Sequence, residues 1–157
     1  MKKHLEVVGA VVVQGDTVLA ARRGESQYPY VAHKYEFAGG KIEPGESPER
    51  ALVREIKEEL CADIRILRPF MSLEHEYPDF TITLHTFLCE FVSDFCNTEH
   101  EALAWLPLSE LNAEDWAPAD APAVEKLKEM RKNLHLCGRY SAVRRAKKTT
   151  GGGGQPK

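Results

Sequence analysis

The sequence predicts a single domain of the α+β class. Short segments rich in β-branched and aromatic residues recur along the chain, and two longer segments carry apolar residues at helical spacing. The 157 residues are enough to bury one sizeable core. The hydrophobic and charged fractions, 43% and 29%, are ordinary for a globular protein, so composition indicates no unusual class.

The first part of the chain predicts a hairpin, a loop and a short strand. Residues 5–13 are apolar and β-branched, and a Gly-Asp turn separates them from a strand expected at residues 17–21. Residues 27–34 contain a Tyr-Pro-Tyr run and predict a loop. Residues 35–38 predict a short strand that leads into a pair of glycines.

A helix is expected to begin at Pro48, because the Ser47 hydroxyl can cap it and proline suits the first helical position. At helical spacing its apolar residues fall on one stripe. That stripe consists of Leu52, Val53, Ile56 and Leu60.

Three carboxylates, Glu55, Glu58 and Glu59, gather on another face of this helix, because positions three and four apart are neighbours. A solvated face would explain them, but clustered like charges repel by about a few tenths of a kcal/mol per pair. A bound cation explains the cluster better, since carboxylate oxygens are the ligands that Mg²⁺ prefers. The preceding glycines, Gly39 and Gly40, would let main-chain groups approach the same ion or a phosphate.

Strands and turns follow this helix. Residues 63–67 and 70–75 predict two strands with Pro69 between them, and residues 80–92 predict one long strand. A polar loop, a short strand and a helical turn are then expected at residues 93–101, 103–106 and 108–111.

A final helix is expected over residues 121–136, with Asp120 as its cap and Gly138 at its end. Residues 139–157 are basic and glycine-rich with few large apolar side chains. We therefore expect a folded domain over residues 1–138 and a disordered tail after it. Weak attraction of the tail to nucleic acid is the alternative to a tail without function.

Charge and cysteine content limit the function classes. The formal net charge of −3 gives no global electrostatic case for nucleic-acid binding. The four cysteines form no C-x-x-C pair, which argues against a zinc site or a redox dithiol, and Cys61 and Cys89 predict core thiols. The sequence shows no secretory or membrane-length apolar run, so we expect a cytoplasmic protein.

The segment GKIEPGESPERALVREIKEELCA resembles the Nudix box, G-x5-E-x7-R-E-U-x-E-E-x-G-U with U apolar. It departs from the pattern at its end, where Cys61 replaces glycine and the small Ala62 replaces a larger apolar residue. The stretches YEFAGGKIEPGES, EYPDFTITLHTFLCE, EHEALAW and APADAP are similar to the MutT branch of the Nudix hydrolases and to the related bacterial CTP pyrophosphohydrolases. The matching box positions are Gly40, Glu46, Arg54, Glu55, Ile56, Glu58 and Glu59.

This resemblance implies an α/β/α sandwich with a mixed central sheet and one helix on each side. It also implies a Mg²⁺ site, with Mn²⁺ as an alternative ion. The implied ligands are the side chains of Glu55, Glu58 and Glu59 and the main-chain carbonyls of Gly39 or Gly40.

Glu46 and Arg54 are implied as a pair that orients the loop against the helix. Glu99 matches a further acidic residue that binds metal or activates water, and Glu101 is its rival for that role. The general base stays open among Glu55, Glu58 and Glu99.

The resemblance also implies substrate contacts. Arg23 matches an arginine that contacts phosphate or base, and Lys41 lies where it can reach a phosphate. Asp120 would face the base edge, where a carboxylate accepts from the exocyclic amine of cytosine. An oxidised guanine fits if Asp120 is protonated or if the ring presents N–H donors. The base pocket would be lined by Phe37, Phe80 and Leu84.

The implied reaction is hydrolysis of a nucleoside triphosphate to a monophosphate and pyrophosphate, with attack at the β-phosphorus. Asp120 favours (d)CTP or modified pyrimidine nucleotides, and 8-oxo-dGTP is the close alternative. Rival functions are hydrolysis at an RNA 5′ end, hydrolysis of a nucleotide sugar, and nucleotide binding by a regulator that has lost catalysis. The expected partner is a small nucleotide, without a membrane or strong nucleic-acid binding, and the protein is expected to be a monomer or homodimer.

Overall fold

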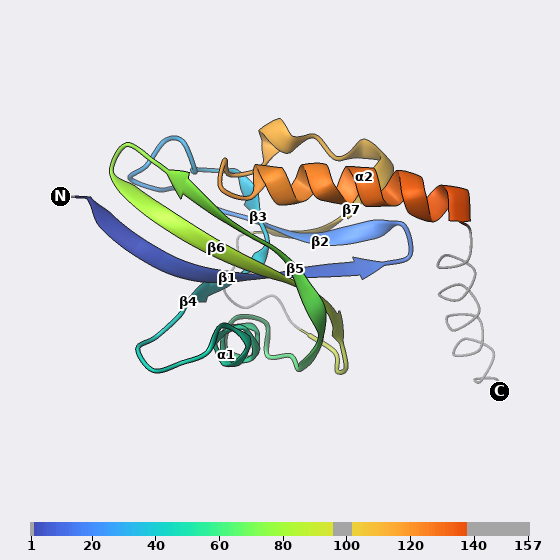
Figure 1. The fold of residues 1–157 in the computed structure, drawn as a ribbon, viewed down its shortest axis with the longest axis horizontal. Helices are drawn as coiled ribbons and strands as arrows, with labels where there is room; N and C mark the ends of the chain where they lie inside the picture. The colour runs from blue at the N-terminus through green and yellow to red at the C-terminus, as the bar shows by residue number, and fades with distance from the viewer. Residues whose placement is uncertain (1, 96–101, 138–157) are drawn as a thin grey trace.

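The structure, a computed structural model, describes residues 2–95 and 102–137. The expected tail, residues 139–157, and the acidic positions Glu99 and Glu101 lie outside the described residues. The described chain forms a mixed sheet with a helix on each side (Figure 1). The α+β prediction and the sandwich implied by the resemblance are therefore confirmed.

The first strand, β1, is the centre of the sheet. It runs parallel to β6 and antiparallel to β4, and at its end it turns into β2, where Val13 pairs with Val18 as the predicted hairpin requires. Strands β3 and β7 pair with β2, and β5 pairs with β6 at the far edge. The strands are β1 (Lys3–Gln14), β2 (Thr17–Arg22), β3 (Tyr35–Glu36), β4 (Ala38–Lys41), β5 (Ile64–Glu76), β6 (Phe80–Phe91) and β7 (Ala102–Pro107).

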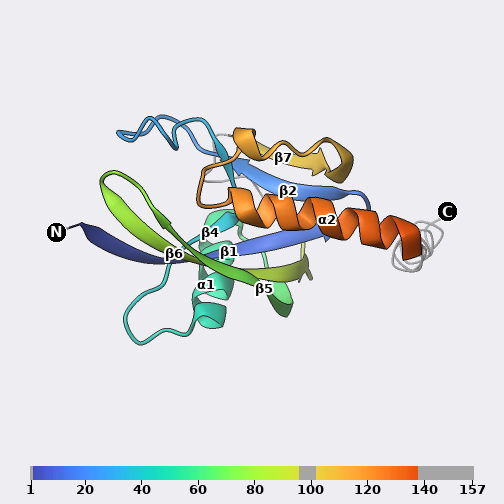
Figure 2. The ribbon, with the colours of Figure 1, turned by 45° about the horizontal axis from the view of Figure 1, so that its top comes forward.

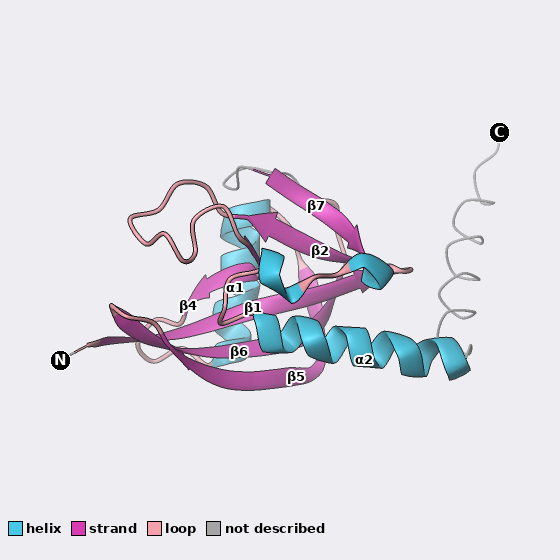
Figure 3. Cartoon of the chain, turned by 90° about the horizontal axis from the view of Figure 1, so that it is seen from above, coloured by secondary structure: helices cyan, strands magenta, loops and turns pink. Residues whose placement is uncertain are grey.

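Two helices cover opposite faces of this sheet. In Figure 1, α1 (Pro48–Leu60) lies below the sheet and is seen end-on, whereas α2 (Ala121–Cys137) lies above it. Figures 2 and 3 show that α2 runs along the strands and that α1 crosses them. Two short 3-10 helices precede α2; Leu108–Glu110 matches the predicted helical turn, and Ala113–Asp115 was not predicted.

The second half of β1, residues 8–13, is buried on both faces, which explains why it is apolar without interruption. Because successive side chains point to opposite faces, Val8 and Ala10 belong to the core under α1, whereas Val11 and Val13 belong to the core under α2. A third, smaller group of buried residues surrounds Tyr77. The sheet thus carries one core on each face.

Helix α1 begins as predicted, because the Ser47 hydroxyl accepts a hydrogen bond from the Arg50 N–H at 3.2 Å. Three residues of the predicted apolar stripe are buried, but Val53 is 43% exposed. Val53 follows Leu52 directly and so points about 100° away from it around the helix. It therefore faces outward.

Helix α1 ends at Cys61, where the Nudix box has glycine. Cys61 adopts the left-handed conformation, with φ 56° and ψ 36°, and its N–H donates to the Lys57 carbonyl at 3.0 Å. The usual helix exit is therefore kept, with a strained residue in place of glycine. The prediction of a core thiol is wrong for Cys61, which is exposed where the chain leaves the helix, and confirmed for Cys89, which is buried.

Two strand boundaries differ from the prediction. Strand β5 continues through Pro69, because an edge strand tolerates proline and two register shifts absorb the irregularity. These shifts lie between Ile66 and Arg68 and between Pro69 and Met71. In contrast, the strand predicted at residues 35–38 divides into β3 and β4, which pair with different partners.

Candidate active site

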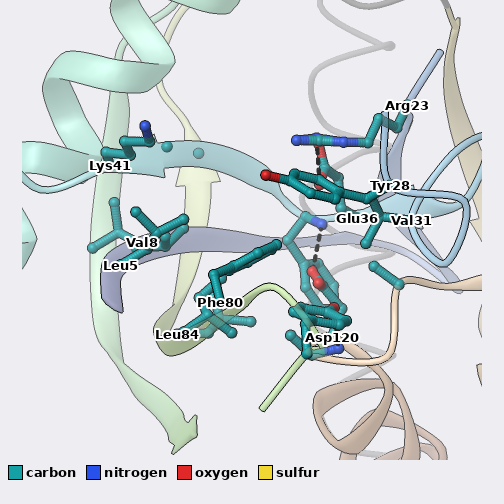
Figure 4. A pocket seen from close by; sticks show the side chains of 18 of the residues that line it. Leu5, Val8, Arg23, Tyr28, Val31, Glu36, Lys41, Phe80, Leu84 and Asp120 are labelled. Atoms are coloured by element: carbon teal, nitrogen blue, oxygen red, sulfur yellow. Dashed lines mark hydrogen bonds and ion pairs between the residues drawn. The ribbon is translucent and has the colours of Figure 1, made fainter. Parts of the chain in front are cut away.

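A cavity of about 640 Å³ lies between the first half of β1, the start of β6, the β3–β4 segment and the loop after β2 (Figure 4). Lys41 lies on one side of it beside α1, and Arg23, Glu36 and Asp120 lie on the other. We call these sides the helix end and the inner end. All six predicted substrate-binding residues line the cavity, namely Arg23, Phe37, Lys41, Phe80, Leu84 and Asp120.

The helix end brings the glycine pair and the acidic helix together. Gly39, Gly40 and Glu59 line the cavity there. A Cβ atom placed on Gly40 would lie 2.4 and 2.6 Å from the two carboxylate oxygens of Glu55, so glycine is what allows this carboxylate to pack against β4. Burial raises the pKa of Glu55, the Arg54 hydrogen bond opposes that rise, and the charges of Glu59 and Glu58 add to it.

Arg54 holds this end in place. Its Nε and Nη2 donate to the two carboxylate oxygens of Glu46 at 2.6 and 2.8 Å, and Nη2 also donates to the Lys41 carbonyl at 3.0 Å. Its Nη1 donates to Glu55 at 3.1 Å and to Glu58 at 3.4 Å. These bonds join the loop after β4 to α1. The Arg54 hydrogen bonds lower the pKa of Glu46 to about 2.

The acidic face of α1 fits a metal ion in its donor chemistry but not in its arrangement. Across residues 2–95 and 102–137, no group of three or more His, Cys, Asp or Glu side chains is arranged to hold one. Arg54 contacts two of the expected ligands, and Glu58 is 60% exposed. The donor chemistry fits nonetheless, because all donors are oxygens and the missing Cβ of Gly40 leaves the Glu55 carboxylate beside the main chain.

The inner end is built around Asp120, which is only 7% exposed. The Phe37 N–H donates to Asp120 Oδ2 at 3.1 Å, so the side chain is joined to β3–β4 although it was expected to cap α2. Burial, with repulsion from Glu36 added to it, raises the pKa of Asp120 to about 8, whereas the Phe37 bond and Arg23 oppose the rise. The carboxyl group is therefore mostly protonated at pH 7.

The apolar residues divide between the cavity and the cores. Phe80 and Leu84 lie on β6 and point into the cavity (Figure 4). Phe37 is 5% exposed and belongs to the core under α2, where its ring centroid lies 4.7 Å from that of Trp116. Phe37 therefore serves the cavity mainly through its main-chain N–H.

Sequence reasoning missed Glu36, Tyr28 and Val31, which also line the cavity. Antiparallel pairing of β2 with β3 places Glu36 opposite Ala21 and near Arg23, with Nη1 and Oε1 3.8 Å apart. A lone acid between two aromatic residues of a strand that leads into the glycine pair was the available signal.

Neither helix in the described part of the chain is long and apolar enough to span a membrane.

Comparisons with known proteins identify the family of this chain. Residues 3–127 match the NUDIX domain. The chain is 38% identical over 131 residues to the 8-oxo-dGTP diphosphatase of Escherichia coli strain K12, a match that covers 83% of this chain and 100% of that protein. It is also 38% identical over 134 residues to the CTP pyrophosphohydrolase of that strain, covering 82% of this chain and 95% of the relative.

A solved structure extends the likeness to three dimensions. The MutT NUDIX hydrolase from Burkholderia pseudomallei has a TM-score of 0.70 and 26% identity, and the match covers 79% of this chain and 98% of that one. With the domain match over most of its length and two relatives matched almost end to end, the chain belongs to the Nudix hydrolase family, among its MutT-like members.

Proposed function

We propose that the protein is a Mg²⁺-dependent nucleoside triphosphate pyrophosphohydrolase, which converts NTP and water to NMP and pyrophosphate. One observation carries the proposal: a single cavity joins Glu59 and the glycine main chain, against which the Glu55 carboxylate packs, at one end to apolar and carboxyl groups at the other. The first end suits phosphates and their counterion, and the second suits a base. The names of the two relatives from Escherichia coli support the same reaction.

Nudix hydrolases generally use a divalent metal ion. We assign its binding here to Glu55, Glu58 and Glu59, with Glu99 and the main-chain carbonyls of Gly39 or Gly40. Mg²⁺ is the proposed ion and Mn²⁺ its alternative. Such an ion supplies positive charge to the phosphates and a more acidic water.

The protein's own side chains position the substrate and move protons. In the proposed step, water attacks the β-phosphorus, the bond from that phosphorus to the oxygen shared with the α-phosphate breaks, and NMP leaves with that oxygen. Lys41 would contact the phosphates, and Arg54 with Glu46 would hold Glu55 and Glu58 in place. The proton of the attacking water would pass to Glu55, Glu58 or Glu99.

The inner end would hold the base, with Phe80 and Leu84 against its ring and Asp120 at its edge. We propose (d)CTP, modified pyrimidine nucleotides or 8-oxo-dGTP as substrates, so the enzyme would remove unwanted nucleotides from the pool. The proposed domain ends near residue 138, and the proposed compartment is the cytoplasm.

A substrate panel with Mg²⁺ tests this function. CTP, dCTP, 5-methyl-dCTP, 8-oxo-dGTP, dGTP and a dinucleotide would each be incubated with the protein, and the products would be identified by chromatography. We expect NMP and pyrophosphate, no reaction with EDTA, and recovery when Mg²⁺ is restored. Release of a nucleoside diphosphate and orthophosphate would contradict the proposed bond cleavage.

A further inference from the structure

The outer side of α1 faces away from the sheet (Figure 1) and carries an exposed apolar residue inside a charged hollow. Val53 is 43% exposed, and the hollow around it has a volume of about 580 Å³. Besides Val53, this outer hollow is lined by Glu46, Glu49, Arg50, Arg54, Lys57 and Asp63. Three of these side chains are acids and three are bases, so the hollow favours neither a strongly acidic nor a strongly basic partner.

Two of these charges are placed symmetrically about Val53. Glu49 lies four residues before it on α1, and Lys57 lies four residues after it. Four residues of an α-helix correspond to about 6 Å along the axis and about 40° around it. The two side chains therefore lie at equal distances from Val53 on opposite sides of it. An acid and a base placed in this way are complementary to the same pair turned through 180°.

We infer that the outer side of α1 is the contact surface of a weak homodimer, in which the α1 helices of two copies pack antiparallel about a two-fold axis through Val53. Glu49 of each copy then faces Lys57 of the other, so the complementary pair is made twice. The two Val53 side chains meet near the axis and lose part of their contact with water. The inference goes beyond the proposed function and does not depend on it, because association is measured without a nucleotide.

The side chains of Glu49 and Lys57 are available for this contact. Both residues are exposed, and Glu49 forms no ion pair with another residue in the described part of the chain. Lys57 pairs with Asp63 at 3.1 Å, and its ammonium group has three N–H donors, so it can also bond Glu49 of the second copy. Such exposed pairs select and orient the partner more than they add affinity.

The small size of the contact limits its affinity. One helix packed on one helix lies at the low end of interface sizes, below about 1,200 Å² in total. We therefore expect a dissociation constant of about 10–100 µM. In dilute turnover assays the protein would be a monomer, so substitutions on this side of α1 should leave turnover unchanged.

The first test measures the mass of the nucleotide-free protein by sedimentation equilibrium from about 5 to about 500 µM. The mean mass should rise from that of the monomer towards twice that value. In Val53→Asp two like charges would meet at the axis, so this variant should stay a monomer. Leu67→Asp is the control, because Leu67 is 44% exposed on β5 outside the hollow, and it should associate like the unchanged protein. A monomer mass for the unchanged protein throughout this range would overturn the inference.

The second test exchanges the charges one at a time at low salt. Glu49→Lys and Lys57→Glu each place like charges opposite each other, so each variant alone should associate at least about tenfold more weakly. An equal mixture of the two should form a heterodimer, because every acid faces a base again. Glu110→Lys is the control, since it makes the same change in net charge at an exposed residue before α2, and it should associate normally.

Circular dichroism checks that each variant keeps its fold. Association that is unchanged in both single variants would place the contact elsewhere, for example at the basic tail, and would contradict the role of α1. A mixture that stays monomeric would contradict the antiparallel arrangement. None of these outcomes depends on whether the protein hydrolyses a nucleotide.

Discussion

The two ends of the cavity use carboxyl groups in opposite ways. At the helix end, Arg54 donates to Glu46, Glu55 and Glu58, and the pKa of Glu46 falls to about 2. At the inner end, Asp120 is buried with one main-chain donor, and its pKa rises to about 8. The Glu46 carboxyl is therefore ionised at pH 7, whereas the Asp120 carboxyl is mostly protonated.

This difference comes from the surroundings and not from the residue type. A guanidinium with several bonds favours the charged form, and burial beside a second acid favours the neutral form. Pairs of acids whose surroundings separate their pKa values are typical of enzyme sites with divided tasks. We therefore expect the helix end to govern turnover and the inner end to govern which base is accepted.

The largest effect is expected from Glu58→Gln at the helix end. Removing this charge should lower turnover on the order of 10³-fold, because Glu58 is a proposed metal ligand and a candidate base. Pyrophosphate release with Mg²⁺ measures turnover, and circular dichroism checks the fold. Glu49→Gln, in the exposed first turn of α1, is the control and should stay near full activity. Near-normal turnover in Glu58→Gln would remove Glu58 from the metal site.

A smaller effect, on stability, is expected at the inner end. Its dependence on pH is opposite to that expected from Glu46, because the pKa of Asp120 is raised and that of Glu46 is lowered. Because folding raises the pKa of Asp120 from 3.8 to about 8, the folded protein binds its proton more tightly than the unfolded chain. The stability contributed by this proton is full below about pH 4 and is lost as the pH rises towards 8. The side chain of Asp120→Asn stays neutral at every pH. Between pH 5 and pH 9, its free energy of unfolding should therefore rise relative to that of the unchanged protein by on the order of 2 kcal/mol.

Urea denaturation of the nucleotide-free protein at several pH values measures this gain. The carboxyl lies near Glu36, Arg23, Tyr77 and the Phe37 N–H, and all four remain in the variant. Asp63→Asn, at an exposed carboxylate paired with Lys57, is the control and should show no such gain. Parallel pH curves for Asp120→Asn and the unchanged protein would mean that Asp120 is ionised in the fold.

The smallest effect is expected where α1 ends, away from both ends of the cavity. Cys61→Gly should raise the free energy of unfolding by about 1 kcal/mol, because glycine adopts the left-handed conformation without strain. Urea denaturation measures the gain, and Cys61→Ser, which keeps the Cβ atom, should show little change. A loss of stability in Cys61→Gly would mean that the thiol makes a contact worth more than the strain.

Local patterns in the sequence predicted much of this fold. Ser47 and the helical spacing located α1, and the Gly-Asp turn located the hairpin of β1 and β2. The parallel pairing of β1 with β6 depends on residues far apart in the chain, and only the family resemblance implied a mixed sheet. The division of this segment into β3 and β4 was also not predicted, because it depends on which strand each of them pairs with.

The site was predictable to a similar degree. The spacing of Glu55, Glu58 and Glu59 placed three acids on one face of α1, since a helix fixes its own neighbours. The contact of Glu36 with Arg23 arises only when β2 and β3 pair, and no spacing along the chain records it. The Asp120 bond to the Phe37 N–H crosses 83 residues and replaces the local cap that the sequence favoured.

The irregular strand β5 has a consequence for contacts between molecules. It forms the outer edge of the described sheet, where Pro69 has no N–H to offer and two bulges break the regular spacing of the backbone. An extended segment of another protein could not form a continuous row of backbone hydrogen bonds along this edge. Strand-by-strand aggregation at this edge is thereby discouraged.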